Sequence, residues 1–259
     1  MRYLFLFSLF FMFACSPSLP KNTDIGDFTL IAEYPHSTNS FTEGLFWHDG
    51  KLFESTAGMA EYPKTKSEFG ILNLATGDIE SKVQFDEKKY FCEGITLLND
   101  KIYQATYKHQ KMFVFDTKTW KKIGEFTYAN TEGWGLTNDG KNIIMSDGSD
   151  MLTFFDPEKL KVTKTLKVTK ENLPIKNINE LEYVDGYIYA NIWLTNRIIK
   201  IDANTGEIAR EFDLSKLTQK TKNQFPNALE MNGIAYHHKK KTFWVTGKFW
   251  GRIYEIELF

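Results

Sequence analysis

Short runs of aromatic and β-branched residues recur along this chain, and each is separated from the next by a turn signal. Residues 91–97, 101–106, 111–116 and 121–128 are four such runs in succession, with Asn99-Asp100 between the first two. Comparable hairpin signals recur at Asp49-Gly50, Asn138-Asp139-Gly140 and Asp185-Gly186. Runs of this length and composition predict β-strands joined in antiparallel hairpins. The chain is therefore expected to be all-β.

A short phrase repeats five times and sets the period of these strands. Its copies read FTEGLFW, FCEGITL, GWGLTND, NELEYVD and NGIAYHH, and the aligned core residues are Gly44, Gly94, Gly135, Glu180 and Gly233. The intervals between them are 50, 41, 45 and 53 residues. Several short strands per unit at this period are typical of β-propellers. We predict one five-bladed β-propeller, because a blade cannot bury its faces alone and must close into a ring.

The two ends of the repeating region are expected to share one blade. The last unit ends with RIYEIELF, which reads as a third strand, and it has no fourth. The segment FTLIAEY, residues 28–34, precedes the first phrase and has the character of a fourth strand. The N-terminal strand is therefore predicted to close the last blade, which removes exposed strand edges. A sixth blade would require irregular strands within residues 51–70, where we instead expect an enlarged loop over residues 57–70.

The first residues have the pattern of an export signal. Arg2 precedes an apolar run from Tyr3 to Ala14, which is too short to span a bilayer. The run leads into a small residue and then Cys15, which resembles a bacterial lipobox with a lipidated cysteine. We expect residues 1–15 to be a signal peptide with a lipobox, 16–25 a tether and 26–259 the propeller. An ordinary signal peptide cleaved nearby is the alternative. Both predict export, and the lipobox predicts a periplasmic or cell-surface bacterial lipoprotein with a lipid anchor in the membrane.

Composition and charge narrow the class of partner. With 32 basic and 33 acidic residues the formal net charge is −1, and no basic stripe stands out, which argues against nucleic-acid binding. Only Cys92 remains after Cys15, so no internal disulfide can form. A closed ring leaves no obvious edge for pairing, and we therefore expect a monomer.

Two rings of repeat-equivalent positions form the candidate site. The first ring precedes the core positions and comprises Glu43, Glu93, Trp134, Asn179 and Asn232. The second ring follows the second strands and comprises Ala57, Tyr107, Gly148, Trp193 and Lys248. Both rings are expected at one face of the propeller, where the side chains of Phe41 and Phe91 are expected to add apolar surface. Polar residues that bond neighbouring blades would keep their type from blade to blade, whereas these positions switch between acid, amide, aromatic and base. We therefore interpret the two rings as a functional site.

The same phrases resemble those of a known family. FTEGL, FCEGI, EGWGLTND with MSDGS, INELEYVDGYIYANIW, and NGIAY with VTGKFW are similar to the motifs of the plant-type glutaminyl cyclases of plants and bacteria. They occur in the same order, from about Phe28 to the end of the chain. The resemblance implies a five-bladed propeller, unrelated in fold to the zinc-dependent animal cyclases. It also implies a glutaminyl-peptide cyclotransferase, an acyltransferase that converts the N-terminal glutamine of peptides and proteins to pyroglutamate and releases ammonia.

The resemblance also assigns roles to individual residues. Carried over by motif, the family's catalytic glutamate falls on Glu93. The substrate-pocket residues fall on Phe41, Glu43, Phe91, Trp134, Asn179, Trp193 and Lys248. The chain departs from the common pattern at Cys92, where the family often has Gly, and at Tyr107, where it often has Trp, so the pocket is expected to be reshaped there. Plant members carry Gln where Glu43 stands, and this chain resembles the bacterial members.

These residue types suit the implied reaction. The α-amine must be neutral to attack its own γ-amide carbon, and the departing ammonia must gain a proton. One carboxyl can do both, so we expect Glu93 to act as general acid and base, with its pKa raised by an apolar site and by the like charge of Glu43. Lys248 and Asn179 are expected to donate to the γ-carbonyl oxygen. The aromatic residues, including Tyr107, are expected to shape the substrate pocket, and no metal or other cofactor is expected.

Two other functions fit the same architecture. A metal-dependent, lactonase-like propeller enzyme would use Glu43, Glu93 and Asn179 as ligands, and a lysine in the same mouth argues against it because it repels a cation. A surface propeller that binds peptides or glycans would use the aromatic residues without needing the catalytic acid. Three weaker signals are interpreted as structural: residues 147–150 as a β-turn rather than a calcium site, His237-His238 as part of a turn, and Cys92 as a buried small residue.

Overall fold

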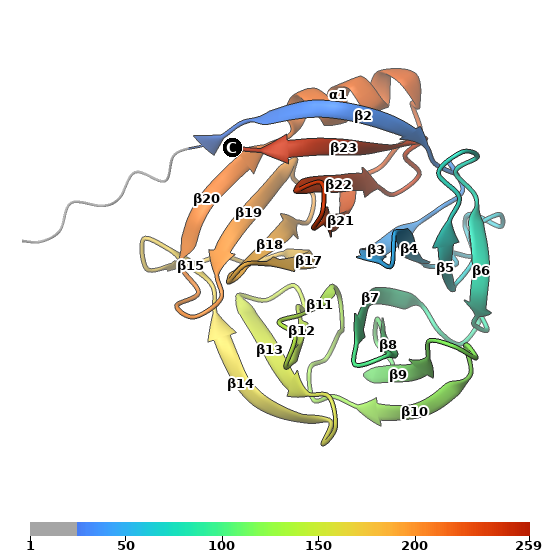
Figure 1. The fold of residues 1–259 in the computed structure, drawn as a ribbon, viewed down its shortest axis with the longest axis vertical. Coiled ribbons are helices and arrows are strands. Elements are labelled where there is room, and N and C mark those ends of the chain that lie inside the picture. The colour runs from blue at the N-terminus through green and yellow to red at the C-terminus, as the bar shows by residue number, and fades with distance from the viewer. Residues whose placement is uncertain (1–24) are drawn as a thin grey trace, which may run out of the picture.

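The computed structural model of the protein describes residues 25–259. They form a ring of five small sheets around one axis, as Figure 1 shows. This arrangement confirms the predicted five-bladed β-propeller. The predicted signal peptide, with Cys15, and all but the last residue of the predicted tether lie outside the described residues. Within residues 25–259, no helix is long and apolar enough to cross a membrane.

Each of the first three blades is a four-stranded antiparallel sheet whose strands run outward from the axis in chain order. Blade 1 comprises β3 (Thr42–His48), β4 (Lys51–Thr56), β5 (Glu68–Leu72) and β6 (Ile79–Gln84). Blade 2 comprises β7 (Cys92–Leu98), β8 (Lys101–Thr106), β9 (Lys111–Asp116) and β10 (Lys122–Thr127). Blade 3 comprises β11 (Leu136–Asn138), β12 (Ile143–Met145), β13 (Met151–Asp156) and β14 (Lys161–Lys167). A small hairpin of β15 (Thr169–Lys170) and β16 (Leu173–Pro174) follows.

The last two blades take in the N-terminal strands. Blade 4 comprises β17 (Ile178–Val184), β18 (Tyr187–Ile192), β19 (Arg197–Asp202) and β20 (Ile208–Asp213), with β1 (Ile25–Gly26) parallel to β20 at its outer edge. Blade 5 comprises β21 (Met231–His237), β22 (Thr242–Gly247), β23 (Arg252–Leu258) and β2 (Phe28–Pro35). β2 pairs antiparallel with β23, and Figure 1 shows it as the outer strand of this blade. The N-terminal strand therefore closes the last blade, as predicted.

Two features differ from the expectations drawn from the sequence. The enlarged loop is shorter than predicted, because residues 68–70 already belong to β5, where Phe69 is fully buried. The sequence pattern also does not predict α1 (Ser215–Gln224), which lies outside blade 5 in Figure 1. The helix lacks an apolar stripe, since its buried residues are Leu217 and two threonines, Thr218 and Thr221. It is held by the fold instead, and the Thr221 hydroxyl lies 2.8 Å from the hydroxyl of Tyr254 in β23.

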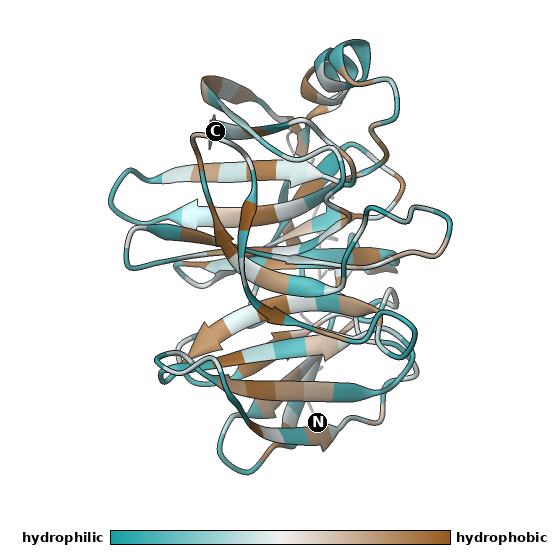
Figure 2. Cartoon of the chain, turned by 90° about the vertical axis from the view of Figure 1, so that its right-hand side faces the viewer, coloured by the Kyte–Doolittle hydropathy of each residue, from teal (hydrophilic) through white to brown (hydrophobic). Residues whose placement is uncertain are grey.

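Apolar side chains pack between neighbouring blades. Between blades 1 and 2, for example, Phe46, Phe53 and Phe69 meet Ile102 and Phe113 in one buried cluster. In the side view of Figure 2, apolar and polar segments alternate along the strands. This alternation lets each blade bury its faces against its two neighbours, which is the packing that the repeat requires.

The inner strands approach each other closely through glycine. A Cβ atom on Gly94 would lie 2.3 Å from the backbone nitrogen of Leu136, and one on Gly135 would lie 2.3 Å from the carbonyl oxygen of Asn179. A side chain at these positions would push adjacent blades apart. The N–H of Gly94 also donates to the carbonyl of Trp134 at 2.7 Å. These contacts bring the residues that precede the glycines close together.

Blade 4 has Glu180 at the position that the other blades fill with glycine. The side chain is fully buried, and its two oxygens accept the backbone N–H groups of Leu45 (3.1 Å) and Ile234 (2.6 Å). Burial raises the pKa of Glu180 well above its ordinary value, although these donors oppose the shift. Glu180 therefore joins blade 4 to the inner strands of blades 1 and 5.

A buried ion pair fastens the closed ring. His36 follows β2, and its Nε2 lies 3.0 Å from Oε1 of Glu54 in β4, with both side chains fully buried. The His36 Nδ1 lies 2.7 Å from the carbonyl oxygen of Trp250, and the Thr42 hydroxyl donates to Glu54 at 2.8 Å. Burial alone would lower the pKa of His36, but the Glu54 carboxylate outweighs this effect and the pKa is raised. The pair thus ties the closing strand to blade 1.

Glu54→Gln is expected to lower the free energy of unfolding by about 3 kcal/mol at pH 6, because it removes the charge that stabilises buried, protonated His36. Folding raises the pKa of His36, so the ion pair with Glu54 stabilises the folded state fully below the unfolded pKa of about 6.5. This contribution is lost as pH rises through the folded pKa of His36. Urea unfolding should therefore show a smaller deficit at pH 9 than at pH 6. The exposed Glu80→Gln serves as control, and an equal deficit at both pH values would contradict the ion pair.

Candidate active site

The two predicted rings open at the same end of the propeller, because their backbones are hydrogen-bonded in register. In four blades, the second-ring residue donates its N–H to the carbonyl of the residue two positions before the first ring. These bonds join Ala57 to Phe41 (3.0 Å), Tyr107 to Phe91 (3.0 Å), Trp193 to Asn177 (2.8 Å) and Lys248 to Glu230 (3.0 Å). Blade 3 differs, since Trp134 donates to Ser146 at 2.9 Å. The alignment made on the sequence therefore matches the register of four blades.

Glu43, Glu93 and Lys248 form a buried charged cluster at this end. The Lys248 Nζ lies 3.0 Å from Oε1 of Glu43 and 3.3 Å from Oε1 of Glu230. Asn232 Nδ2 donates to the other oxygen of Glu43 at 2.9 Å, and Glu43 is near enough to Glu93 for its charge to raise the pKa of that carboxyl. Glu43 is 1% exposed, and Glu93 and Lys248 are each 6% exposed. Electrostatic interactions within the cluster are therefore little screened by water.

Burial controls the protonation of both acids. It raises the pKa of Glu43 to about 7, although the Lys248 ammonium opposes the shift. It also raises the pKa of Glu93 well above its ordinary value, and the charge of Glu43 adds to this effect. Burial alone would lower the pKa of Lys248, but the surrounding carboxylates, Glu43 foremost, outweigh it and the pKa is raised. The two acids therefore titrate as a coupled pair beside a charged lysine, and burial favours the protonated form of each.

Aromatic rings form two walls around this cluster. On one side, the ring centroids of Phe41 and Phe91 are 6.0 Å apart, and those of Phe91 and Tyr107 are 5.7 Å apart. On the other side, Trp134 and Trp193 meet edge to face with centroids 5.6 Å apart. The Lys248 ammonium lies over the Phe41 ring, 4.3 Å from its centroid, and Trp193 donates to Glu230, so apolar rings adjoin the charged groups of the cluster. Apolar surface beside a few polar groups is typical of the lining of small-ligand sites.

Two acids that the sequence analysis did not select orient the indoles. Trp134 Nε1 donates to Glu132 at 3.0 Å, and Trp193 Nε1 donates to Glu230 at 3.2 Å. Both acids occupy the position two residues before the first ring, which the phenylalanines of the aromatic wall fill in blades 1 and 2. Comparison of that single position across all five blades is the signal that would have found them.

Asn179, of the first ring of repeat-equivalent positions, and Gly148, of the second, have features that bear on the site. Asn179 is 4% exposed, and its Oδ1 has no hydrogen-bond partner among the described residues. A buried amide oxygen of this kind is available to a bound molecule. Gly148 has a φ of 77°, and a Cβ atom there would lie 2.6 Å from the ring of Trp134. Glycine is therefore required at that position to leave room for the indole.

The weaker sequence signals are structural in the fold. Cys92 is fully buried, and burial raises the pKa of its thiol well above the ordinary value, so it is a poor nucleophile. The Asp147 side chain accepts the N–H of Ser149 at 3.0 Å and thereby forms a local turn. Within residues 25–259, no group of three or more His, Cys, Asp or Glu side chains is arranged to hold a metal ion.

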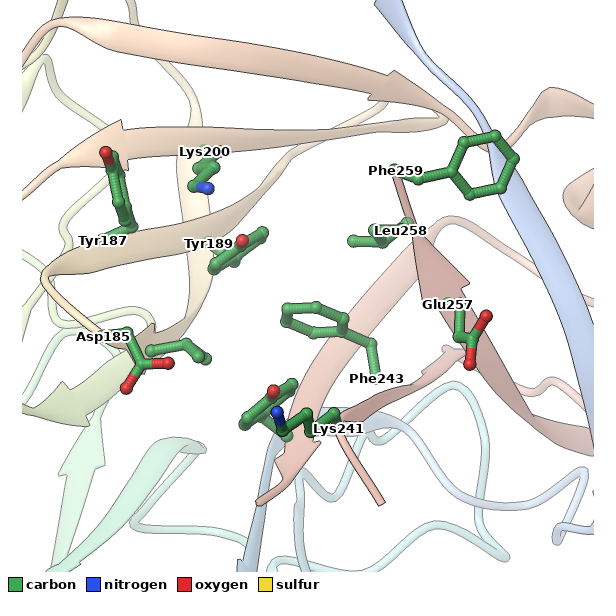
Figure 3. A pocket seen from close by; sticks show the side chains of 11 residues that line it. Asp185, Tyr187, Tyr189, Lys200, Lys241, Phe243, Glu257, Leu258 and Phe259 are labelled. Atoms are coloured by element: carbon green, nitrogen blue, oxygen red, sulfur yellow. The ribbon is translucent and has the colours of Figure 1, made fainter. Parts of the chain in front are cut away.

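A separate pocket lies between blades 4 and 5, and Figure 3 shows its aromatic and charged side chains. It has a volume of about 360 Å³, and its lining includes Tyr187, Tyr189, Lys200 and Phe243. Tyr187 begins β18, whereas Trp193 follows the end of that strand, so the pocket lies at the other end of the blade. It shares no lining residue with the two rings.

Lys248→Met is expected to raise the pKa of Glu43 above about 7, by ~1–3 pH units, because it removes the opposite charge 3.0 Å from that carboxyl. Titration of the protein labelled with ¹³C at glutamate side chains, followed by NMR, measures the change. Lys82→Met, next to the exposed Glu80, is the matched control and should leave the buried titration unchanged. A Glu43 titration that stays near pH 7 in Lys248→Met would contradict this electrostatic assignment.

Similarity to known proteins extends over nearly the whole chain. Residues 6–258 match the family described as glutamine cyclotransferase. The chain is 33% identical over 243 residues to the glutaminyl-peptide cyclotransferase of Arabidopsis thaliana, which covers 93% of this chain and 74% of that protein. The fold matches the crystal structure of Myxococcus xanthus glutaminyl cyclase with a TM-score of 0.80 and 32% identity, over 90% of this chain and 97% of that one. These matches confirm the resemblance carried by the five phrases, and the chain belongs to the glutamine cyclotransferase family.

Proposed function

We propose that the protein converts the N-terminal glutamine of peptides and proteins to pyroglutamate, releasing ammonia, with Glu93 as general acid and base. The proposal is supported by the names of its Arabidopsis and Myxococcus relatives, a glutaminyl-peptide cyclotransferase and a glutaminyl cyclase. The observation that carries it is the buried pair of Glu43 and Glu93 beside Lys248, in which the pKa of Glu93 is raised well above its ordinary value.

The reaction forms one bond and breaks one. The neutral α-amine attacks the γ-amide carbon and closes a five-membered lactam, and the bond from that carbon to the amide nitrogen breaks. The attacking nitrogen loses a proton, and the leaving nitrogen gains one and departs as ammonia. Because Glu93 and Glu43 titrate as a coupled pair with raised pKa values, the pair accepts the proton of the amine while Glu93 returns one to the leaving group.

Charge develops on the γ-carbonyl oxygen as the amine attacks, and Lys248 and Asn179 are the side chains expected to stabilise it. Lys248 is held by Glu43 and Glu230 and carries a raised pKa, so it remains a charged donor. Asn179 is 4% exposed, and its side-chain NH2 is the group that would donate, since the Oδ1, which has no partner among the described residues, can only accept. Removal of one such donor typically costs about 10²–10³ in kcat.

The aromatic walls would hold the substrate in its reactive shape. The glutaminyl side chain must fold back until its γ-carbon meets its own amine. We expect the aliphatic part of that chain to pack on the contacting rings of Phe41, Phe91 and Tyr107 and on the pair of Trp134 and Trp193. A reaction within one molecule gains much of its rate from such positioning.

Glu93→Gln is expected to lower kcat on a glutaminyl dipeptide by at least about 10²-fold, because it removes proton transfer and keeps the shape of the side chain. Ammonia release by the full-length chain in detergent, with and without a chelator, measures the loss. Glu87→Gln, an exposed carboxylate between β6 and β7, is the matched control.

The remaining outcomes of that assay separate the alternatives. Near-normal turnover by Glu93→Gln would remove Glu93 from the catalytic role. Turnover by the wild type that is lost in chelator would support a metal-dependent, lactonase-like mechanism. The absence of turnover by the folded wild type would favour a propeller that binds peptides or glycans.

We also propose that the protein is a monomeric, exported bacterial lipoprotein anchored through Cys15, on the pattern of residues 1–15. Cys15→Ser is expected to move the protein from the membrane fraction to the soluble fraction, since it removes the lipidated thiol. Cell fractionation with mass spectrometry of the mature N-terminus measures this, and Cys92→Ala is the control. A soluble wild-type protein with no lipid would instead support an ordinary signal peptide.

A further inference from the structure

A groove of about 740 Å³ lies beside the candidate active site and contains none of the residues assigned to it. One side is formed by residues 61–65 of the loop between β4 and β5, and the other by Gln224 at the end of α1 and by residues 225–227 and 229 after it. Thr38, Asn39 and Phe249 complete its lining. The volume falls within the range of about 300–1,000 Å³ that is typical of ligand sites.

The groove and the site share one wall. Leu229 and Phe249 line the groove, while their chain neighbours Glu230 and Lys248 form an ion pair of the site at 3.3 Å. Leu229 donates its N–H to the carbonyl of Lys248 at 2.9 Å, so the two segments are locked together. Phe249 also packs edge to face on Phe41, with centroids 5.3 Å apart. The ion pair of the site is therefore one residue along the chain from the lining of the groove on both segments.

An aromatic surface leads outward along this groove. The ring centroid of Phe249 is 4.8 Å from that of Tyr62, which is 44% exposed. Pro63 adds further apolar surface, and Asn39 and Asn227 supply side-chain amides. Amides offer both donors and acceptors, which suits a polypeptide that presents N–H and C=O groups along its length.

The loop that carries Tyr62 is ordered by its own hydrogen bonds. The N–H of Tyr62 donates to the carbonyl of Met59 at 3.0 Å, and the hydroxyl of buried Thr65 donates to the carbonyl of Tyr62 at 2.7 Å. Thr65 Oγ1 in turn accepts the N–H of Met59 at 2.7 Å. A wall that is already ordered binds its ligand with a smaller loss of conformational entropy.

We propose that this groove binds the substrate residues that follow the N-terminal glutamine, and that it favours an aromatic or large apolar side chain at the third position. The inference rests on the function proposed above, because a glutaminyl residue held at Glu93 needs a path by which its own chain leaves the pocket. The rings of Phe41 and Tyr62 both contact the ring of Phe249, so their centroids are at most about 10 Å apart. An extended chain spans this distance in about three residues. Peptides of three or more residues are therefore expected to be better substrates than glutaminyl dipeptides.

The test compares kcat/KM of the full-length protein for two tripeptide amides, Gln-Gly-Phe and Gln-Gly-Gly, through ammonia release. We expect the wild type to prefer Gln-Gly-Phe by about tenfold through a lower KM, as a stacked aromatic contact implies. Tyr62→Ala should bring the ratio of the two values close to one, whereas Tyr62→Phe, which keeps the ring, should preserve it. Ile123→Ala, at a 54% exposed apolar residue of β10, is the matched control and should also preserve it.

The outcomes distinguish this inference from the function on which it rests. Failure of the folded wild type to release ammonia from either peptide would overturn the proposed function and, with it, the occupant named for the groove. Turnover of both peptides with equal kcat/KM, or a preference that survives in folded Tyr62→Ala, would overturn the assignment of the groove and leave the proposed function standing.

Discussion

The close approach of the inner strands at the propeller axis is the constraint on which the site depends. Glycine at positions such as Gly94 and Gly135 lets the backbone of one blade touch that of the next, where a Cβ atom would lie 2.3 Å from backbone atoms. In blade 4, the buried carboxyl of Glu180 instead binds two N–H groups of neighbouring inner strands. Since Glu43 and Glu93 directly precede glycines of this ring, the same packing that closes the ring also brings the two acids together.

The convergence of the inner strands at the axis also removes water from the charged groups there. This burial lowers stability, but it favours acid–base catalysis. Burial raises the pKa of Glu43 to about 7 from an ordinary value near 4.5, so its ionisation lowers stability as pH rises through that interval. Lys248 limits the cost because its ammonium lies 3.0 Å from the carboxylate. A carboxyl that gains and loses its proton near neutral pH is, for the same reason, suited to general acid–base catalysis.

The repeat supplies a common backbone, and differences between blades supply the chemistry. Two positions before the first ring, blades 1 and 2 carry phenylalanines that wall the site, whereas blades 3 and 5 carry Glu132 and Glu230, which orient the indoles. In blade 5, adjacent residues serve two surfaces: Glu230 and Lys248 form an ion pair in the site, and their neighbours line the groove beside it. A symmetric scaffold thus produces an asymmetric site.

The five phrases, their glycines and the missing last strand are local patterns of spacing, and by themselves they determine five blades, the closing strand and the common face of the two rings. Local patterns do not predict the helix α1 or the early start of β5. Thr221 of α1 and Phe69 of β5 are held by contacts with distant strands. Such patterns do not predict the partners of the charged groups either, since His36 and Glu54, or Lys248 and Glu43, meet only when the ring closes. The raised pKa of Glu43, and the buried Oδ1 of Asn179 that lacks a partner among the described residues, were decided by the tertiary structure alone, because burial and distances between blades set these properties and neither is present in a local stretch of sequence.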